Sequence, residues 1–411
     1  MEASAFAGAF FMVLRKRLGI LIKTRLLPFR IAHIVAGFVA VLVGYTSSAV
    51  IIFQAADAIG ATPEQISSWL WALGIGMGLT SIGLSLFYKK PILTAWSTPG
   101  AALLVTSLSG LSMNEAVGAF IVSSMLIVLF GVAGWFNLFV RSIPTELASA
   151  MLAGVLFAFG INVFVAMQSN VVLVGLMLGV FFTLKFRLPR YAIFLTLIVG
   201  VFTSLVQGEV LLSSFETSLT TPVWVTPKFT VGAIIGVAIP LFIVTMASQN
   251  IPGYAALRAH GYQVNPSPLM TWTGLAGVIL APFGGYAFNL AAITAAICMT
   301  PEVDEDPKQR FMAPVWAGLF YLLTGIFGAA VVSLFLMFPT ELVMAIAGIA
   351  LITTIANSLT IALSNDQSRE PALLTFMITV SGISLFGIGS AFWGLLIGLL
   401  ANYWLSKNQQ I

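Results

Sequence analysis

The sequence predicts an all-α polytopic membrane protein with fourteen transmembrane segments, arranged as two inverted repeats of seven. Of the 411 residues, 59% are hydrophobic and 8% are charged, and the mean hydropathy is +1.04. In a soluble domain, roughly 25% of the residues are charged. Apolar runs long enough to cross a bilayer recur from residue 31 to the C-terminal region. The basic residues also fall almost entirely in loops that this topology places on one side of the membrane.

Residues 1–30 form a basic N-terminal segment with six Lys and Arg residues among apolar ones. The apolar residues 5–14 precede the charges, which is the reverse of the order in a signal peptide, so we expect no cleavage. Two alternatives stay open for this segment. One is an amphipathic helix on the cytoplasmic membrane surface, and the other is a basic tail without regular structure.

Fourteen apolar segments follow, and the third, ninth and tenth are short or interrupted by proline and glycine. If the N-terminus is inside the cell, 17 of the 18 Lys and Arg residues fall on the cytoplasmic side and only Lys228 lies outside. An extra or missing helix would move the basic residues after it to the other side of the membrane and so disrupt this distribution. Both termini are therefore predicted to be cytoplasmic. The predicted segments are 31–54, 66–87, 92–108, 114–136, 144–167, 170–187, 190–207, 230–248, 268–282, 284–299, 311–337, 340–362, 371–387 and 389–406.

An external linker, 208–229, divides the chain into a first repeat, 31–207, and a second repeat, 230–406. Each repeat contains seven segments, and an odd number gives the repeats opposite orientations in the membrane. The sequence Pro-Thr-Glu-Leu opens both segment five, at 144–147, and segment twelve, at 339–342. Because these segments are seven apart, the echo supports the repeat.

Segments three and ten are each expected to contain a half-helix that begins at membrane depth. Thr98 is suited to be the N-cap of the first half-helix, with Pro99 in its first turn. Asn289 is suited to be the N-cap of the second, which would begin at Leu290. Half-helix N-termini that face a cavity attract anions. The alternative is that the proline kink at 94–104 serves packing alone.

Segment eight is predicted to end near Pro252, just after two consecutive amides, Gln249 and Asn250. Amide side chains near membrane depth need partners, which are either a ligand or another helix. We favour a ligand role for these amides, and helix–helix hydrogen bonding is the alternative.

The remaining polar residues exclude several functions. None of the 14 acidic residues lies in the middle of a predicted span, the acidic loop 302–306 is expected to be solvated, and His33 is expected to be an interfacial histidine. A single cysteine, Cys298, and two distant histidines give no disulfide and no metal site. The spans contain no Ser–His, Ser–Lys or paired-aspartate arrangement that would indicate an enzyme. The net charge of +4 follows from membrane topology and does not indicate nucleic-acid binding.

Four stretches resemble the bacterial benzoate transporter family. They are TAWSTPGAALL at 94–104, TMASQN at 245–250, AAITAAIC at 291–298 and GIGSAFWG at 387–394. The resemblance extends along the chain from about residue 31. It implies a uracil-transporter-like fold and proton-coupled uptake of benzoate, an aromatic carboxylate, across the bacterial cytoplasmic membrane. The coupling proton is the only cofactor-like species implied.

The same resemblance implies a core domain, 31–136 plus 230–337, and a gate domain, 144–207 plus 340–406. The substrate would lie between these domains and contact segments one, three, eight and ten. Relatives of this fold are often dimers, so a homodimer is left open.

In nucleobase transporters of this fold, acidic residues on segments eight and ten bind the substrate and couple protons. The matching positions here are neutral, which suits benzoate: its carboxylic acid has a pKa of roughly 4, so it is an anion at neutral pH that a pocket carboxylate would repel. The predicted substrate-binding residues are Tyr45, Trp96, Ser97, Thr98, Gln249, Asn250, Phe288 and Asn289. Another small organic anion or a nucleobase is the alternative substrate. The proton carrier is left open among the substrate, His33 and other groups.

Overall fold

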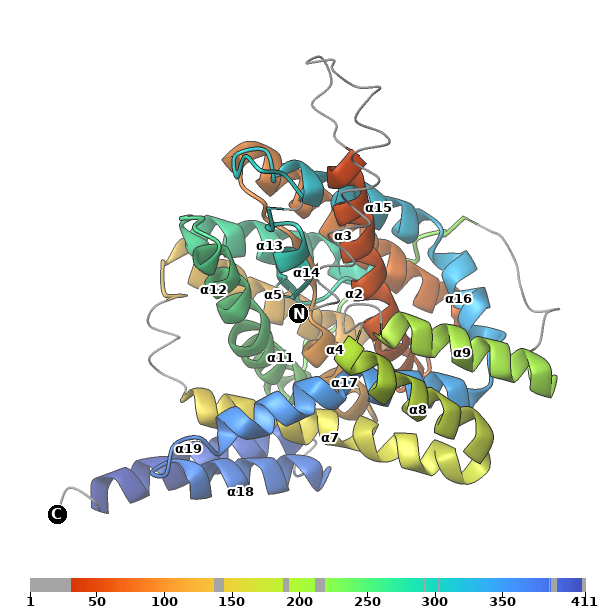
Figure 1. The fold of residues 1–411 in the computed structure, drawn as a ribbon. Helices are drawn as coiled ribbons and strands as arrows, with labels where there is room; N and C mark the ends of the chain where they lie inside the picture. The colour runs from red at the N-terminus through yellow and green to blue at the C-terminus, as the bar shows by residue number, and fades with distance from the viewer. Residues whose placement is uncertain are drawn as a thin grey trace.

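The computed structural model describes residues 31–136, 144–187, 192–210, 219–291, 293–301, 303–383, 385 and 390–408. The predicted basic segment 1–30 lies outside the described residues. Figure 1 shows helices in two groups, with α7, α8, α18 and α19 along the bottom of the view and α3, α5, α13 and α15 above them.

The upper group holds the predicted segments one to four and eight to eleven. Its helices and strands are α2 (Ile31–Asp57), α3 (Pro63–Tyr88), β1 (Thr94–Trp96), α4 (Thr98–Ser107), α5 (Met113–Val132), α10 (Val231–Ala233), η2 (Ile234–Ala238), α11 (Ile239–Thr245), η3 (Met246–Asn250), α12 (Ile251–Ala259), α13 (Pro266–Leu280), η4 (Ala281–Phe283), β2 (Phe288–Leu290), α14 (Ile293–Ile297), α15 (Met312–Ile326) and α16 (Gly328–Leu336). The lower group holds α7 (Thr145–Ser169), α8 (Val171–Arg187), α9 (Ala192–Gln207), α17 (Thr340–Ala362), α18 (Arg369–Val380) and α19 (Ser390–Asn408).

Five helices are long and apolar enough to cross a membrane by themselves: α3, α5, α7, the continuous helix Val231–Ala259, and α17. A sixth results if Ile31–Tyr45 and Ser48–Asp57, the two parts of α2 that meet at 40°, count as one span. Each of the fourteen predicted segments contains a helix, but several of these helices are shorter than a bilayer is thick. The chain is a helical membrane protein, and the fourteen crossings stay a prediction.

The contacts between helices of the first seven predicted segments recur between the helices seven segments later in the chain. α15 packs along α3, and α5 packs along α13 in the corresponding way. α8 packs on α9 as α18 packs on α19, while α7 and α17 pack on each other. At the α3–α15 crossing an added Cβ on Gly74 would lie 2.6 Å from the Cα of Gly325, so only glycine allows this approach. This contact pattern is expected of a chain built from two related halves.

The Pro-Thr-Glu-Leu echo marks the starts of α7 and α17. Each helix follows a proline, Pro144 or Pro339, and carries a glutamate in its first turn, Glu146 or Glu341. A carboxylate is stabilised near a helix N-terminus, which supports a structural role for both glutamates.

Residues 219–230 form a connecting segment that makes hydrogen bonds and an ion pair with separate elements of the upper group. The backbone N–H of Val225 donates to the carbonyl of Pro282 at 2.8 Å. The ammonium group of Lys228 lies 3.2 Å from the carboxylate of Glu115, at the start of α5. The described part of the predicted external linker therefore lies across one end of the upper group.

Candidate functional site

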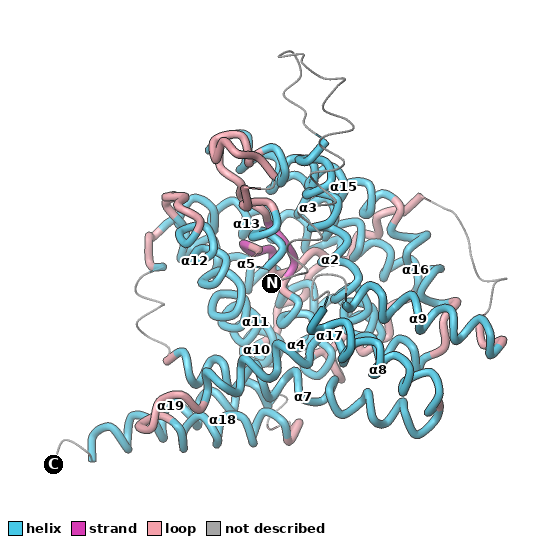
Figure 2. Tube along the Cα trace, viewed as in Figure 1, coloured by secondary structure: helices cyan, strands magenta, loops and turns pink. Residues whose placement is uncertain are grey.

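The two interrupted segments meet at a short antiparallel strand pair among the helices of the upper group (Figure 2). β1 pairs with β2, with Ala95 opposite Asn289. The backbone N–H of Ala291 extends the pairing by donating to the carbonyl of Leu93 at 3.0 Å. Backbone polar groups at membrane depth must find partners within the protein, and the strand pair supplies them where both segments leave helical geometry.

The first half-helix, α4, begins at Thr98, but its N-cap is Ser97, so the expectation that Thr98 is the cap is wrong. The hydroxyl of Ser97 accepts the N–H of Gly100 at 3.0 Å. The backbone N–H of Ser97 donates to the carbonyl of Ala287 at 3.1 Å, which continues the strand pairing and keeps Ser97 extended, as an N-cap requires. Ser97 is fully buried, whereas Thr98 is half-buried and is the first residue of the helix.

Asn289 lies in β2, so the expectation that it is a helix N-cap is also wrong. Pairing with β1 keeps the chain extended at Asn289, and the described residues of α14 are Ile293–Ile297. The side-chain N–H of Asn289 donates to the carbonyl of Ala287 at 3.0 Å, while its Oδ1 is buried without a partner among the described residues. So short a helix has only a small dipole. Of the two half-helices, α4 therefore has the N-terminus that would attract an anion more strongly.

Gln249 and Asn250 lie in the π-helical turn η3, within a helix that continues beyond it. The expected helix end near Pro252 is therefore wrong. A proline ring clashes with the preceding turn of a regular α-helix, and the wider π turn gives it room. The Oδ1 of Asn250 accepts the backbone N–H of Leu290 at 3.0 Å, so this buried amide joins η3 to β2.

The amide of Gln249 differs from that of Asn250. Its side chain is half-buried and makes no hydrogen bond within the part of the chain that the structure describes. η3 packs against β2 and also against α7, and α4 packs against α7 as well. Gln249 is thus available to donate a hydrogen bond to a ligand near the junction of α4, η3 and α7.

The aromatic residues predicted for the site separate into two places. The Nε1 of Trp96 donates to the hydroxyl of Ser48 at 2.9 Å, and its ring lies 4.8 Å from that of Tyr45 in an edge-to-face arrangement. Phe288 is 1% exposed and packs against Gly76 of α3 and Gly277 of α13. The structure therefore brings Tyr45 and Trp96 together, while Phe288 fills a helix interface.

Two hydroxyl residues that were not predicted to bind the substrate hold the candidate site in shape. Ser48 holds the indole of Trp96, and its three-residue spacing from Tyr45 on a helix was the signal that both face one side. Thr94 anchors β1 to α3, because its hydroxyl lies 2.8 Å from that of Ser81 and 2.6 Å from that of Thr80. Hydroxyl–hydroxyl pairing over such distances in the chain has no sequence signature.

One carboxylate of the acidic loop is buried, contrary to the expectation that the loop is solvated. The Oδ2 of Asp304 lies 3.0 Å from the Nε2 of His33, and both side chains are almost fully enclosed. The physical reason is Arg310, whose Nε donates to the carbonyl of Asp304 at 2.7 Å and whose second nitrogen donates to the carbonyl of Met299 at 2.8 Å. These bonds fold the loop inward against α2.

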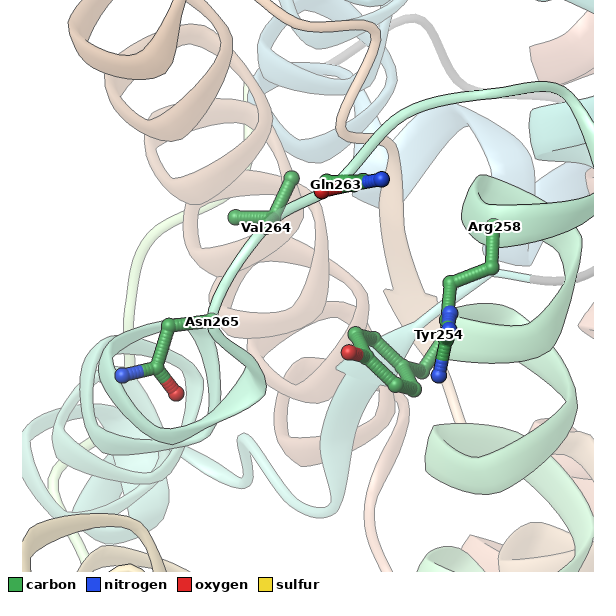
Figure 3. A pocket seen from close by; sticks show the side chains of 5 residues that line it. All are labelled: Tyr254, Arg258, Gln263, Val264 and Asn265. Atoms are coloured by element: carbon green, nitrogen blue, oxygen red, sulfur yellow. The ribbon is translucent and has the colours of Figure 1, made fainter.

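A pocket of about 390 Å³ opens beside the far end of α12 (Figure 3). Tyr254 and Arg258 project from α12 on one side of it, and the loop that leads to α13 forms the other side. Its lining residues are Tyr254, Arg258, Gln263, Val264 and Asn265. Arg258 lies on the helix that continues from η3, about two helical turns beyond it.

Two interrupted segments that pair through short strands, in a helical membrane protein whose helix contacts repeat between its two parts, are typical of membrane transporters. Solved structures share the fold. The transmembrane domain of the cyanobacterial bicarbonate transporter BicA has a TM-score of 0.59 at 11% identity and covers 90% of this chain and 97% of that chain. Murine Slc26a9 in its inward-facing state, an anion transporter, has a TM-score of 0.57 at 13% identity and covers 98% of this chain and 72% of that chain. At these identities the likeness shows the fold alone.

The chain belongs to the benzoate membrane transport protein family, whose sequence model matches residues 28–404. It is 49% identical over 365 residues to the inner membrane protein YdcO of Escherichia coli (strain K12), which covers 89% of this chain and 93% of that protein. It is 39% identical over 387 residues to the benzoate membrane transport protein of Acinetobacter baylyi, which covers 94% of this chain and 98% of that protein. The predicted family is confirmed, and the chain is a transporter rather than an enzyme.

Proposed function

We propose that the chain carries benzoate, or a closely related aromatic carboxylate, together with a proton into the cell across the bacterial inner membrane. The family and the relative named benzoate membrane transport protein support the substrate. The relative named inner membrane protein supports the location. The distribution of Lys and Arg supports fourteen crossings with both termini in the cytoplasm.

The observation that carries this proposal is a polar and aromatic site without charge. Trp96 ends β1 just before α4 and contacts Tyr45, Thr98 is the first residue of α4, and Gln249 lies in η3, which packs against α7 as α4 does. Every described acidic residue lies in the first or last turn of a helix or in a loop. Described carboxylates are thus kept away from the level of the strand pair, where they would repel an anion. The helix N-terminus supplies attraction instead.

In the proposed complex, the benzoate carboxylate lies at the N-terminus of α4. The backbone N–H of Thr98 and the amide of Gln249 donate hydrogen bonds to it, and each bond to a charged group contributes about 1.5–3 kcal/mol. The ring packs against Tyr45 and Trp96, whose edge-to-face contact gives this wall a fixed shape.

The other predicted residues have a different role in this proposal. The Oδ1 of Asn289 is a hydrogen-bond acceptor and does not suit a carboxylate. Ser97 caps α4 and Asn250 joins η3 to β2, so both of their side chains are already engaged. We assign these residues, with Phe288, to holding the site in shape.

The helix contacts support the division into a core and a gate domain. α4 and η3 of the proposed core pack against α7 of the proposed gate, and α2 packs against α17. The substrate would then lie at the boundary of the two domains. Movement of one domain against the other would open the site to each side of the membrane in turn.

Uptake of radiolabelled benzoate into proteoliposomes tests the proposal. We expect accumulation with an inward proton gradient and its collapse on addition of a protonophore. Unlabelled uracil and a small aliphatic acid, added as competitors, test the alternative substrates. If folded protein took up no benzoate with or without the gradient, the substrate would be wrong; uptake indifferent to the gradient would overturn the proton coupling alone.

A further inference from the structure

A buried titratable pair lies away from the candidate site. His33 is in the first turn of α2, and Asp304 lies 271 residues later in the loop between α14 and α15. The Nε2 of His33 is 3.0 Å from the Oδ2 of Asp304, and the two side chains are 1% and 0% exposed. Burial of an ionisable pair is costly, so its presence calls for a physical explanation.

Hydrogen bonds hold the loop that carries Asp304. The Oδ1 of Asp304 accepts the backbone N–H of Asp306 at 3.0 Å, while the guanidinium group of Arg310 binds the carbonyls of Asp304 and Met299. The loop that carries Asp304 also carries the charged residues Glu305, Asp306, Lys308 and Arg310. Two titratable groups of neighbouring elements contact this loop or the residue that follows it: the hydroxyl of Tyr262 donates to the carbonyl of Pro307, and the ammonium of Lys89 lies over the ring of Phe311.

The pair also joins two elements whose other parts form the candidate site. His33 lies twelve residues before Tyr45 on α2, about 18 Å along the helix. Asp304 follows α14, which begins just after β2. α14 and α2 pack on each other, so the pair fastens together the far ends of both elements. A change at the pair thus acts on the relative position of the elements that hold Tyr45 and the strand pair.

Histidine is the side chain that changes charge near neutral pH. With a neutral imidazole, the pair is a hydrogen bond from the ring N–H to the Asp304 carboxylate. A proton taken from water adds to the other ring nitrogen and converts this bond into an ion pair, in which both groups are charged. The carboxylate needs no proton of its own, and the same proton leaves to water when the imidazolium dissociates.

We propose that the His33–Asp304 pair is the binding site of the coupling proton. This inference rests on the proposed proton-coupled uptake, and names the groups that carry it out. The proton binds at the pair when benzoate is bound at α4, and the ion pair holds α2 against the loop after α14 while the domains move. Release of the proton loosens this attachment as benzoate leaves.

Three proteins in proteoliposomes test the inference: wild type, His33→Gln and Asp304→Asn. Benzoate counterflow, which needs no proton gradient, reports binding and folding, and a pH-sensitive dye inside the vesicles reports proton entry. For one proton per benzoate, a gradient of about one pH unit drives about tenfold accumulation, because one unit is a tenfold ratio of proton concentrations. We expect both variants to keep counterflow and to lose this accumulation and the proton signal. The matched control is His260→Gln, because His260 is the other histidine of the chain and is exposed.

Incorporation of 2-fluorohistidine into the His260→Gln protein provides a second test that changes little in shape. This ring keeps its size but does not become protonated near neutral pH, so accumulation is expected to disappear while counterflow stays. This test also decides the question if His33→Gln fails to fold. Full accumulation in the fluorinated protein would overturn the inference and leave the proposed function intact. If the wild type itself shows no gradient-driven accumulation, the proposed coupling fails first.

Discussion

The side-chain oxygen of Asn250 accepts the backbone N–H of Leu290 at 3.0 Å, and thereby joins the π turn of segment eight to the strand of segment ten. The two groups lie forty residues apart in the chain and are both buried. This bond holds η3 against β2.

Replacement of Asn250 by alanine leaves the N–H of Leu290 buried without an acceptor, which costs about 1–3 kcal/mol. We expect a clear loss of thermal stability in detergent, measured by the melting temperature. Asn114→Ala is the control, because its side chain donates to the carbonyl of Thr226 at an exposed position. Equal losses in the two variants would show that the buried bond has no special weight.

Gln249→Ala is expected to weaken benzoate binding about tenfold, which corresponds to about 1.4 kcal/mol. Its stability should change little, because the side chain is half-buried and makes no bond with the described residues that the substitution would break. Isothermal titration measures the affinity, and Gln309→Ala, at an exposed loop position, is the control. Unchanged affinity in folded Gln249→Ala protein would remove this amide from the site.

Gly253→Ala should destabilise the protein by about 1–3 kcal/mol, the usual cost of overpacking. The added Cβ would lie 2.6 Å from the carbonyl oxygen of Leu290, which is fixed by the strand pair. Gly83→Ala provides a matched control, since nothing lies within 4 Å of the added atom. Its helix should gain up to about 1 kcal/mol from the better propensity of alanine. Melting temperatures that move together would contradict this account.

Burial raises the pKa of Tyr262, with an opposing contribution from the nearby guanidinium of Arg310. An unfolded tyrosine ionises near pH 10, so the unfolded state releases its proton before the folded state does. The stability from this group is therefore present below about pH 10 and is lost as the pH rises further. Melting curves between neutral and alkaline pH should fall more steeply for the wild type than for Tyr262→Phe.

Tyr262→Phe also removes the hydrogen bond from the Tyr262 hydroxyl to the carbonyl of Pro307, at 3.0 Å. At neutral pH we expect a loss of about 0.5–1.5 kcal/mol for this bond. Parallel pH curves for the two proteins would mean that Tyr262 does not respond to pH differently in the folded and unfolded states.

The interrupted segments were predictable because proline, glycine and polar residues break apolar runs at 94–104 and around 284–289. Their pairing was not predictable, because strands of three residues have no periodic pattern and their partner lies almost two hundred residues away. The N-cap illustrates the limit of local reasoning. Ser97 and Thr98 both carry hydroxyls, and only the bond from Ser97 to Ala287 selects the cap.

The buried pair shows a second limit. Composition alone indicates a solvated acidic loop at 302–306, and this expectation is wrong for Asp304 because His33 and Arg310 come from other parts of the fold or loop to enclose it. The family, by contrast, followed from contiguous motifs, which need no knowledge of long-range contacts.

The uncharged lining of the candidate site has an energetic consequence for the cell. A benzoate anion that travels with one proton adds no net charge to the protein. Membrane voltage is worth about 2.3 kcal/mol per elementary charge for each 100 mV, and this energy acts on a net charge only. On the proposed coupling, uptake would therefore draw on the difference in acidity across the membrane and not on its voltage. A bacterium in alkaline surroundings would lose benzoate accumulation even while its membrane stayed fully polarised.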